Sequence, residues 1–246
     1  MAQEQFIDAV MEQIFVRGYI CPARSVVAVC VQTDRQRLGT LPDPADYAGK
    51  VVQFLGLRIQ PDGEMGTPSP SAGARYEWLA VHEAGHAIVG VKAGLTLWGV
   101  RFYNDGFPGQ AFFYDPDWKE SRDEHLLRRL IRVDVASNVA ELLHPACGDR
   151  EGRLSAFYDD RSSGQRPTDF IDADKKARRL AIVRFEAVGK EPGTDEVWRA
   201  RREILEQAEA EAEQVLRENM GTLMTLAQEL RRGPMTGATV RAIVGE

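Results

Sequence analysis

Two histidines four residues apart, His82 and His86, are the clearest chemical feature of this 246-residue sequence. On an α-helix this spacing places both rings on one face, where their nitrogens can reach one zinc ion at about 2.0–2.1 Å. Glu83 is rotated by about 100° from His82, so its carboxylate can stand near the ion without ligating it. The stretch His82-Glu83-Ala84-Gly85-His86 therefore predicts a zinc site in which Glu83 acts as a general base.

Chance is a poor explanation of this motif. The chain has four histidines, and a random sequence of this composition would contain such a motif about once in two hundred cases. The motif also lies within residues 75–91, where apolar side chains recur every three or four positions before Gly94. This stretch is predicted to be an amphipathic helix.

A hydrolytic zinc site needs a third protein ligand and an open position for water. Metzincin proteases place a third histidine six residues after the second, and Lys92 at that position excludes this class. A thermolysin-like site takes a glutamate from a following helix, for which Glu120, Glu124 and Glu141 are candidates. The residues alone leave this choice open.

Residues 76–89 resemble the zinc peptidase domain of the FtsH-type membrane-anchored AAA+ proteases. The resemblance continues through residues 135–143, which contain an Ala-Glu pair, and through residues 213–244, which resemble the terminal helices of that domain. It also includes an aspartate followed at helical spacing by two alanines and an arginine, namely Asp169, Ala173, Ala177 and Arg178. The resemblance covers about residues 75–246.

This resemblance implies that Asp169 is the third metal ligand and that each chain binds one zinc ion. Asp172 and Asp174 are rivals that lie out of register with the two alanines. The resemblance further implies that Glu141 holds a ligating histidine in the correct tautomer, as partners of zinc ligands generally do. His125 has no motif around it and is expected to be an ordinary residue, as is His144.

The expected fold is mainly α within the α+β class: an HExxH zincin-type helical peptidase domain with a small edge β-sheet. Two short strands are predicted at residues 97–103 and 110–114, separated by a turn. Helices are predicted at residues 123–143, 168–185, 194–219 and 221–232. An extended substrate could join the sheet as an added strand, with Val100, Phe102 and Phe112 as substrate-binding residues.

Residues 1–66 are predicted to form an accessory α/β segment, and residues 67–74 a linker to the peptidase domain at 75–246. Apolar residues at helical spacing predict a helix around residues 6–15, and a second helix is expected at 46–54. The apolar run at residues 25–32 is predicted to be a buried strand. Because residues 61–73 are rich in Pro, Gly and Ser, a chain truncated to start near Pro68 is expected to fold.

The composition and the charge pattern limit the kinds of binding partner and the location that are expected. The net charge is −6, and 31 basic residues are scattered among 37 acidic ones, so nucleic acid is an unfavoured partner. No apolar stretch approaches the roughly 20 residues needed to cross a bilayer, so no membrane anchor is expected. The N-terminus lacks the features of a signal peptide, which makes the cytoplasm the expected location. Three widely spaced cysteines, Cys21, Cys30 and Cys147, are expected to be reduced thiols.

These features predict a zinc-dependent metallopeptidase that cuts unfolded or extended protein segments. No Gly-x4-Gly-Lys-Ser/Thr loop is present, so hydrolysis is expected to need no ATP. Three alternatives stay open: a non-catalytic zinc-containing binding or regulatory module, a peptidase subunit that needs a partner ATPase, and an enzyme for another amide or ester. A homo-oligomer is also compatible with the sequence.

Overall fold

The computed structural model describes residues 1–17, 19, 21, 24–57, 73–101, 110–113, 118–144 and 168–245. Within these residues the protein is mainly helical and contains one small antiparallel sheet. The predicted mainly α class is therefore confirmed. No helix in the described ranges is long and apolar enough to cross a membrane.

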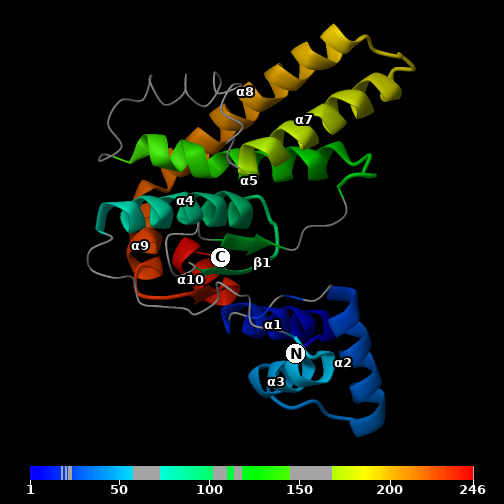
Figure 1. Ribbon diagram of the computed structural model, residues 1–246, viewed down its shortest axis with the longest axis vertical. Helices are drawn as coiled ribbons and strands as arrows, with labels where there is room; N and C mark the ends of the chain where they lie inside the picture. Colours follow the sequence, from blue (N-terminus) through cyan, green and yellow to red (C-terminus); the bar gives the residue numbers. More distant parts are fainter. Residues whose placement is uncertain are drawn as a thin grey trace.

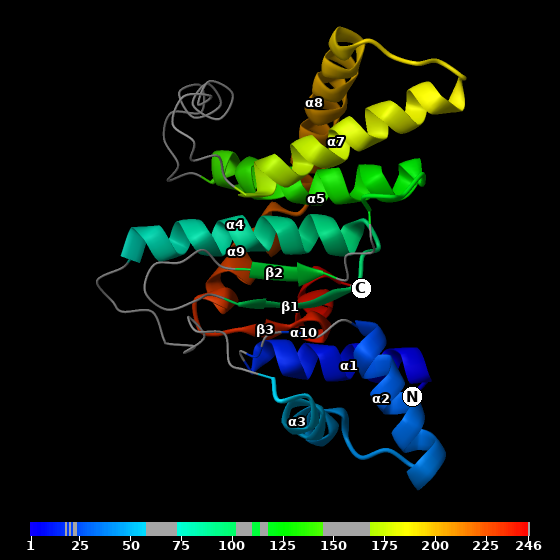
Figure 2. The same ribbon diagram turned by 45° about the vertical axis from the view of Figure 1, so that its right-hand side comes forward.

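The predicted motif helix is α4 (Gly73–Lys92), and it lies between a helical layer and the sheet. The middle strand of the sheet is β1 (Leu97–Arg101), flanked by β2 (Gln110–Phe113) and by β3 (Met235–Thr236), both antiparallel to it. Figure 2 shows β2 as the strand next to α4. The sequence predicted β1 and β2, whereas the two-residue β3 is too short to leave a periodic pattern.

The helices beyond the sheet follow the predicted order. Above α4 lies α5 (Glu124–Leu143), which is crossed in turn by α7 (Thr168–Ala187) and α8 (Thr194–Glu218) (Figure 1). The chain then returns through α9 (Met220–Leu230) and α10 (Gly237–Val244) to the sheet. The apolar faces of these helices form one continuous core with α4 and β1.

The N-terminal part consists of three helices, α1 (Gln3–Val16), α2 (Arg24–Leu38) and α3 (Pro44–Leu55). The predicted strand at residues 25–32 is wrong, because these residues lie in α2, and the expected α/β segment is helical where it is described. Val27 and Val31 are buried, whereas Val29 is exposed, so the helix hides only part of the apolar run. A short apolar run does not by itself distinguish a strand from a helix.

Several predictions fall on residues outside the described ranges. Of the predicted linker at residues 67–74, residues 67–72 lie outside the described ranges, and the last two residues begin α4. Cys147 also lies outside these ranges, while Cys21 and Cys30 have free thiols as expected. The proposed division between residues 1–66 and 75–246 stays a prediction.

The contacts of α1 nevertheless tie the N-terminal helices to the sheet. The ring of Phe15 stacks on that of Phe112 in β2, with centroids 5.1 Å apart. In β1, Arg101 Nη1 donates a hydrogen bond of 2.7 Å to the carbonyl of Phe15. Trp98, also in β1, is only 4% exposed and packs in the core of the N-terminal helices. The sheet thus has α4 on one side and α1 on the other (Figure 2).

We therefore expect Phe15→Ala to lower the free energy of unfolding by about 3–5 kcal/mol, the usual cost of removing a buried aromatic ring. Urea denaturation followed by circular dichroism measures this change. Phe54 is 81% exposed in α3, so Phe54→Ala should stay within about 0.5 kcal/mol of the parent protein.

The same contacts reverse the expectation for the truncated chain. Removal of α1 would expose Trp98 and Phe112 and leave the Arg101 guanidinium without its carbonyl partner. A chain starting near Pro68 should therefore be poorly soluble, and a soluble, cooperatively folding truncation would contradict this view.

Candidate metal centre

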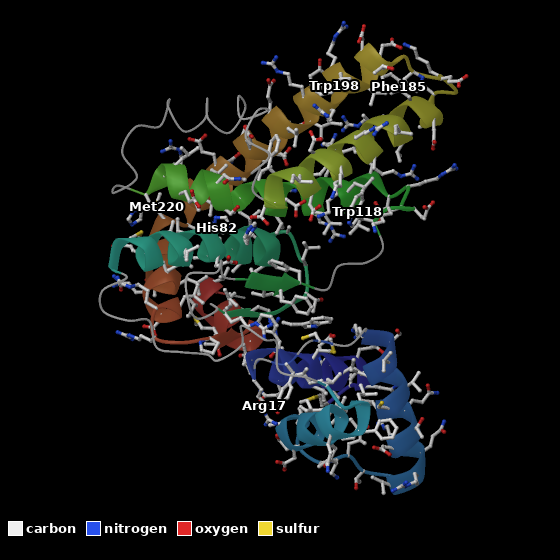
Figure 3. All side chains as sticks on the ribbon, viewed as in Figure 1. Arg17, His82, Trp118, Phe185, Trp198 and Met220 are labelled. Atoms are coloured by element: carbon white, nitrogen blue, oxygen red, sulfur yellow. The ribbon has the colours of Figure 1, made fainter. Side chains whose placement is uncertain are left out.

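The two motif histidines lie on the face of α4 that meets α5, as Figure 3 shows for His82. Their Nδ1 atoms are both engaged by α5: His82 Nδ1 is 2.7 Å from Glu141 Oε1, and His86 Nδ1 is 2.7 Å from the carbonyl of Val133. A carbonyl only accepts hydrogen bonds, so Nδ1 of His86 carries the hydrogen. In the neutral ring this leaves Nε2 with a lone pair, which is the state that a metal needs.

Both Nε2 atoms converge on Asp169, near the start of α7. Asp169 Oδ2 is 3.1 Å from Nε2 of His82 and 3.4 Å from Nε2 of His86. One ligand atom from each of the three residues lies within 4.8 Å of the others, so the group could hold a metal ion. With both imidazoles neutral, two lone pairs and a carboxylate oxygen face one another, an arrangement that a cation stabilises.

The pKa values of the two histidines and of Asp169 show that this group attracts positive charge. Burial opposes the charged form of His82, but hydrogen bonds to Asp169 and Glu141 outweigh it and raise its pKa to about 10. The pKa of His86 is also raised against burial, through Asp169. Burial alone would raise the pKa of Asp169, yet its bonds to the two histidines hold that pKa well below its ordinary value. The carboxylates thus favour positive charge between the ligands.

Glu83 lies beside this group, and its carboxylate is enclosed. The residue is 2% exposed, and burial raises the pKa of its side chain. The backbone N–H of Ala111 in β2 donates a hydrogen bond to the carboxylate. Its Oε2 has no hydrogen-bond partner among the described residues. Buried polar atoms are seldom left unpartnered, so this oxygen marks a place where a ligand or a water molecule belongs.

Gly85 explains how α5 comes close enough to orient both histidines. A Cβ atom at this position would lie 2.6 Å from Cβ of Ala140 and 2.8 Å from the carbonyl oxygen of Ala136. Both distances are shorter than van der Waals contact, and one involves backbone that cannot turn aside. The glycine inside the motif therefore permits the close approach of α4 and α5.

The structure brings together four of the predicted site residues and the expected partner. His82, His86 and Asp169 form the metal group, Glu83 lies next to it, and Glu141 bonds to His82 on the side away from Asp169. Zinc ligation and catalysis by these residues stay predictions.

The three predicted substrate-binding residues lie elsewhere. Val100 is fully buried in the middle strand, and the ring of Phe112 packs against Phe15 and Trp98. Phe102 lies outside the described residues. Of the two strands expected to accept a substrate, β1 pairs on both sides and β2 is at the edge of the sheet.

The rival acidic residues have partners elsewhere. Asp172 pairs with Lys175, and Asp174 pairs with Arg201. Glu124, the first residue of α5, pairs with Arg128 and Arg184. His144 is buried near Glu77, and His125 is exposed.

Two features of the site are not predicted from the sequence. The carbonyl of Val133 leaves no trace in side-chain types, so sequence could not reveal it. Asp134 and Lys176 form a buried ion pair between α5 and α7. Here the sequence gives only a weak signal, because each charged residue has both polar and apolar neighbours on its own helical face.

Neither a known protein-family model nor a curated protein matches this chain.

The geometry predicts how single substitutions change metal content. His82→Ala, His86→Ala and Asp169→Ala should each abolish stoichiometric zinc, since each removes one of three ligands. Glu141→Ala should weaken binding by about 10- to 100-fold, as loss of a residue that orients a ligand does. Elemental analysis and chelator competition measure both effects. If Asp169→Ala kept its zinc and Glu141→Ala lost it, the third ligand would be Glu141.

A second prediction concerns Gly85. Gly85→Ala should lower zinc affinity at least tenfold and destabilise the protein by about 1–3 kcal/mol, because the added methyl group pushes α5 from α4. The matched control is Gly221→Ala in α9, where a Cβ meets nothing within 4 Å and the change should be neutral or slightly stabilising. Unchanged zinc affinity in Gly85→Ala would show that the helix spacing does not matter to the site.

Proposed function

We propose that the protein is a zinc-dependent peptidase that hydrolyses peptide bonds in extended protein segments without consuming ATP. One observation carries this proposal: two imidazole nitrogens and a carboxylate oxygen converge beside the buried carboxylate of Glu83. The resemblance of the motif and of its partners Glu141 and Asp169 to the FtsH-type peptidase domain points to the same chemistry.

Zinc is the metal that this donor set suits best. Two histidines and one carboxylate are a common ligand set of catalytic zinc sites, which keep a fourth position for water. When bound, zinc acts as a Lewis acid that makes water a nucleophile near neutral pH and polarises the scissile carbonyl. A purely structural zinc site instead closes all four positions, which weighs against the non-catalytic alternative.

Glu83 supplies the proton transfers in this proposal. Its unpartnered Oε2 accepts a proton from the attacking water and later returns that proton to the leaving amine. The hydrogen bond from Ala111 holds the carboxylate in place, and burial keeps bulk water from competing for it. The orientation of the base thus depends on β2 as well as on α4.

The strand β2 also suggests the form of the substrate. Within the described residues it pairs with β1 alone, and its Ala111 N–H is directed to Glu83. A peptide in extended conformation that adds along this edge would bring its backbone to the base, whereas a folded domain offers no free strand. Unfolded or extended chains are therefore the proposed substrates, and the edge of β2 replaces β1 in this role.

The test uses an unfolded casein-like protein, no nucleotide, and zinc-loaded enzyme. Glu83→Gln should keep its zinc and lose about 10²- to 10⁴-fold in rate, because the amide cannot accept the proton. Glu77→Gln makes the same chemical change on the same helix at a residue outside the metal group, and it should cleave like wild type.

Three outcomes would contradict the proposal. Undiminished cleavage by zinc-loaded Glu83→Gln would remove the base. No cleavage of any unfolded chain by wild type would favour a binding module or a need for a partner ATPase. Equal rates on the unfolded chain and on a tightly folded domain would exclude strand addition as the mode of recognition.

A further inference from the structure

A buried ion pair joins α5 to α7 close to the metal group. Lys176 Nζ lies 2.8 Å and 3.1 Å from the two carboxylate oxygens of Asp134. The side chains are 6% and 17% exposed, respectively. The ammonium group also lies 5.5 Å from the ring centroid of Trp118, which lies below α7 in Figure 3. Each partner is thus shielded from water on several sides.

Both members of the pair are tied to the ligands through their own helices. Asp134 follows Val133, whose carbonyl accepts the hydrogen bond from His86. Lys176 is seven residues after Asp169, which is two helical turns, so both side chains leave the same face of α7. The pair therefore links the segment that orients one ligand to the helix that carries another.

The apolar contacts of α7 next to Lys176 are made by small side chains. Phe170, directly after Asp169, is a large buried side chain, but Ala173 and Ala177 on either side of Lys176 are small, and Leu180 and Ala181 follow them. Methyl groups interlock less than larger side chains do, so they fix the rotation of a helix less sharply. Two hydrogen bonds from one ammonium group to both oxygens of a carboxylate have a defined direction and distance.

A contribution to folding stability does not explain why this buried ion pair is present. Removing two charges from water costs roughly as much as their attraction returns, and apolar replacements of similar size are often as stable. Burial raises the pKa of Asp134 to about 7 even with the lysine beside it, which shows how large that cost is here. Fixing one arrangement of two helices is a better-supported use of such a pair.

We infer that Asp134 and Lys176 are positioning residues: their ion pair sets the register of α7 on α5, so that Asp169 meets both histidines. This inference rests on the proposed zinc function. It predicts that the pair controls zinc affinity more than it controls stability. A zinc site needs its donors placed to within a few tenths of an ångström, so a small shift of α7 is enough to weaken it.

The experiment compares zinc affinity, by competition with a chromophoric chelator, with thermal stability of the metal-free protein. Lys176→Met should lower the affinity by about 10- to 100-fold, as loss of a supporting contact does. It also leaves Asp134 buried without its cation, so loss of folding in this variant is controlled by a second change. The double variant Asp134→Leu/Lys176→Met removes both charges and should recover the melting temperature but not the affinity. Lys176→Arg keeps the charge and should keep most of the affinity.

The matched control is Arg184→Met. Arg184 of α7 also pairs with an α5 residue, Glu124, at 2.7 Å, but it lies fifteen residues from Asp169 and is more exposed. Its loss should leave zinc affinity unchanged.

A double variant with wild-type zinc affinity would overturn the inference, since the pair would then only fill space. So would an equal loss of affinity in Arg184→Met. Chelator competition does not depend on hydrolysis: a wild type that binds zinc but cuts nothing contradicts the proposed function, while the affinity ratios still decide the role of the pair. A wild type that binds no zinc contradicts both.

Discussion

The close contact of α4 with α5 at Gly85 is the constraint on which the rest of the site depends. With no side chain at this position, the backbone of α5 reaches the metal face of α4. That approach brings Val133 to one histidine and Glu141 to the other. The two helices together position both histidines, and α7 adds Asp169, the third residue of the metal group, by packing on α5. A glycine costs about 1 kcal/mol in helix propensity, and at this cost both histidines gain a hydrogen-bond partner on α5.

The sheet extends this dependence to the other side of α4. Ala111 of β2 bonds to Glu83, so the position of the Glu83 carboxylate follows the position of that strand. The strand in turn is held by Phe15 of α1, through the stacking on Phe112. A helix at the start of the chain thus influences the geometry around residue 83, although no residue of α1 belongs to the metal group. Phe15 packs on the side of the sheet away from α4, so a change there would reach Glu83 through the strands of the sheet.

The sequence was most informative where a single helix decides the outcome. The spacing of His82 and His86 and the apolar period around them need only local geometry, and the long helices from α5 to α9 follow from the same periodicity. The strand prediction for residues 25–32 is wrong because the conformation of a short apolar run depends on tertiary neighbours that the sequence does not reveal. The contact between Phe15 and Phe112 was likewise out of reach, since it joins residues nearly a hundred positions apart. Asp169 came within reach only through resemblance to a family, because aspartates at helix starts are common for other reasons.

The charges around the site show why its parts have to be considered together. Asp169, Glu141, Glu83 and Asp134 place four carboxylates near two imidazoles, and Lys176 neutralises the one that lies behind the ligands. Pairing Asp134 with Lys176 neutralises a carboxylate that would otherwise compete with Asp169 for a cation. The remaining carboxylates differ in position: Asp169 lies between the two Nε2 atoms, Glu141 bonds to Nδ1 of His82, and Glu83 keeps one oxygen without a partner among the described residues. Similar side chains thus acquire different roles from the helix or strand that each one faces, which is why a motif of five residues cannot define the site by itself.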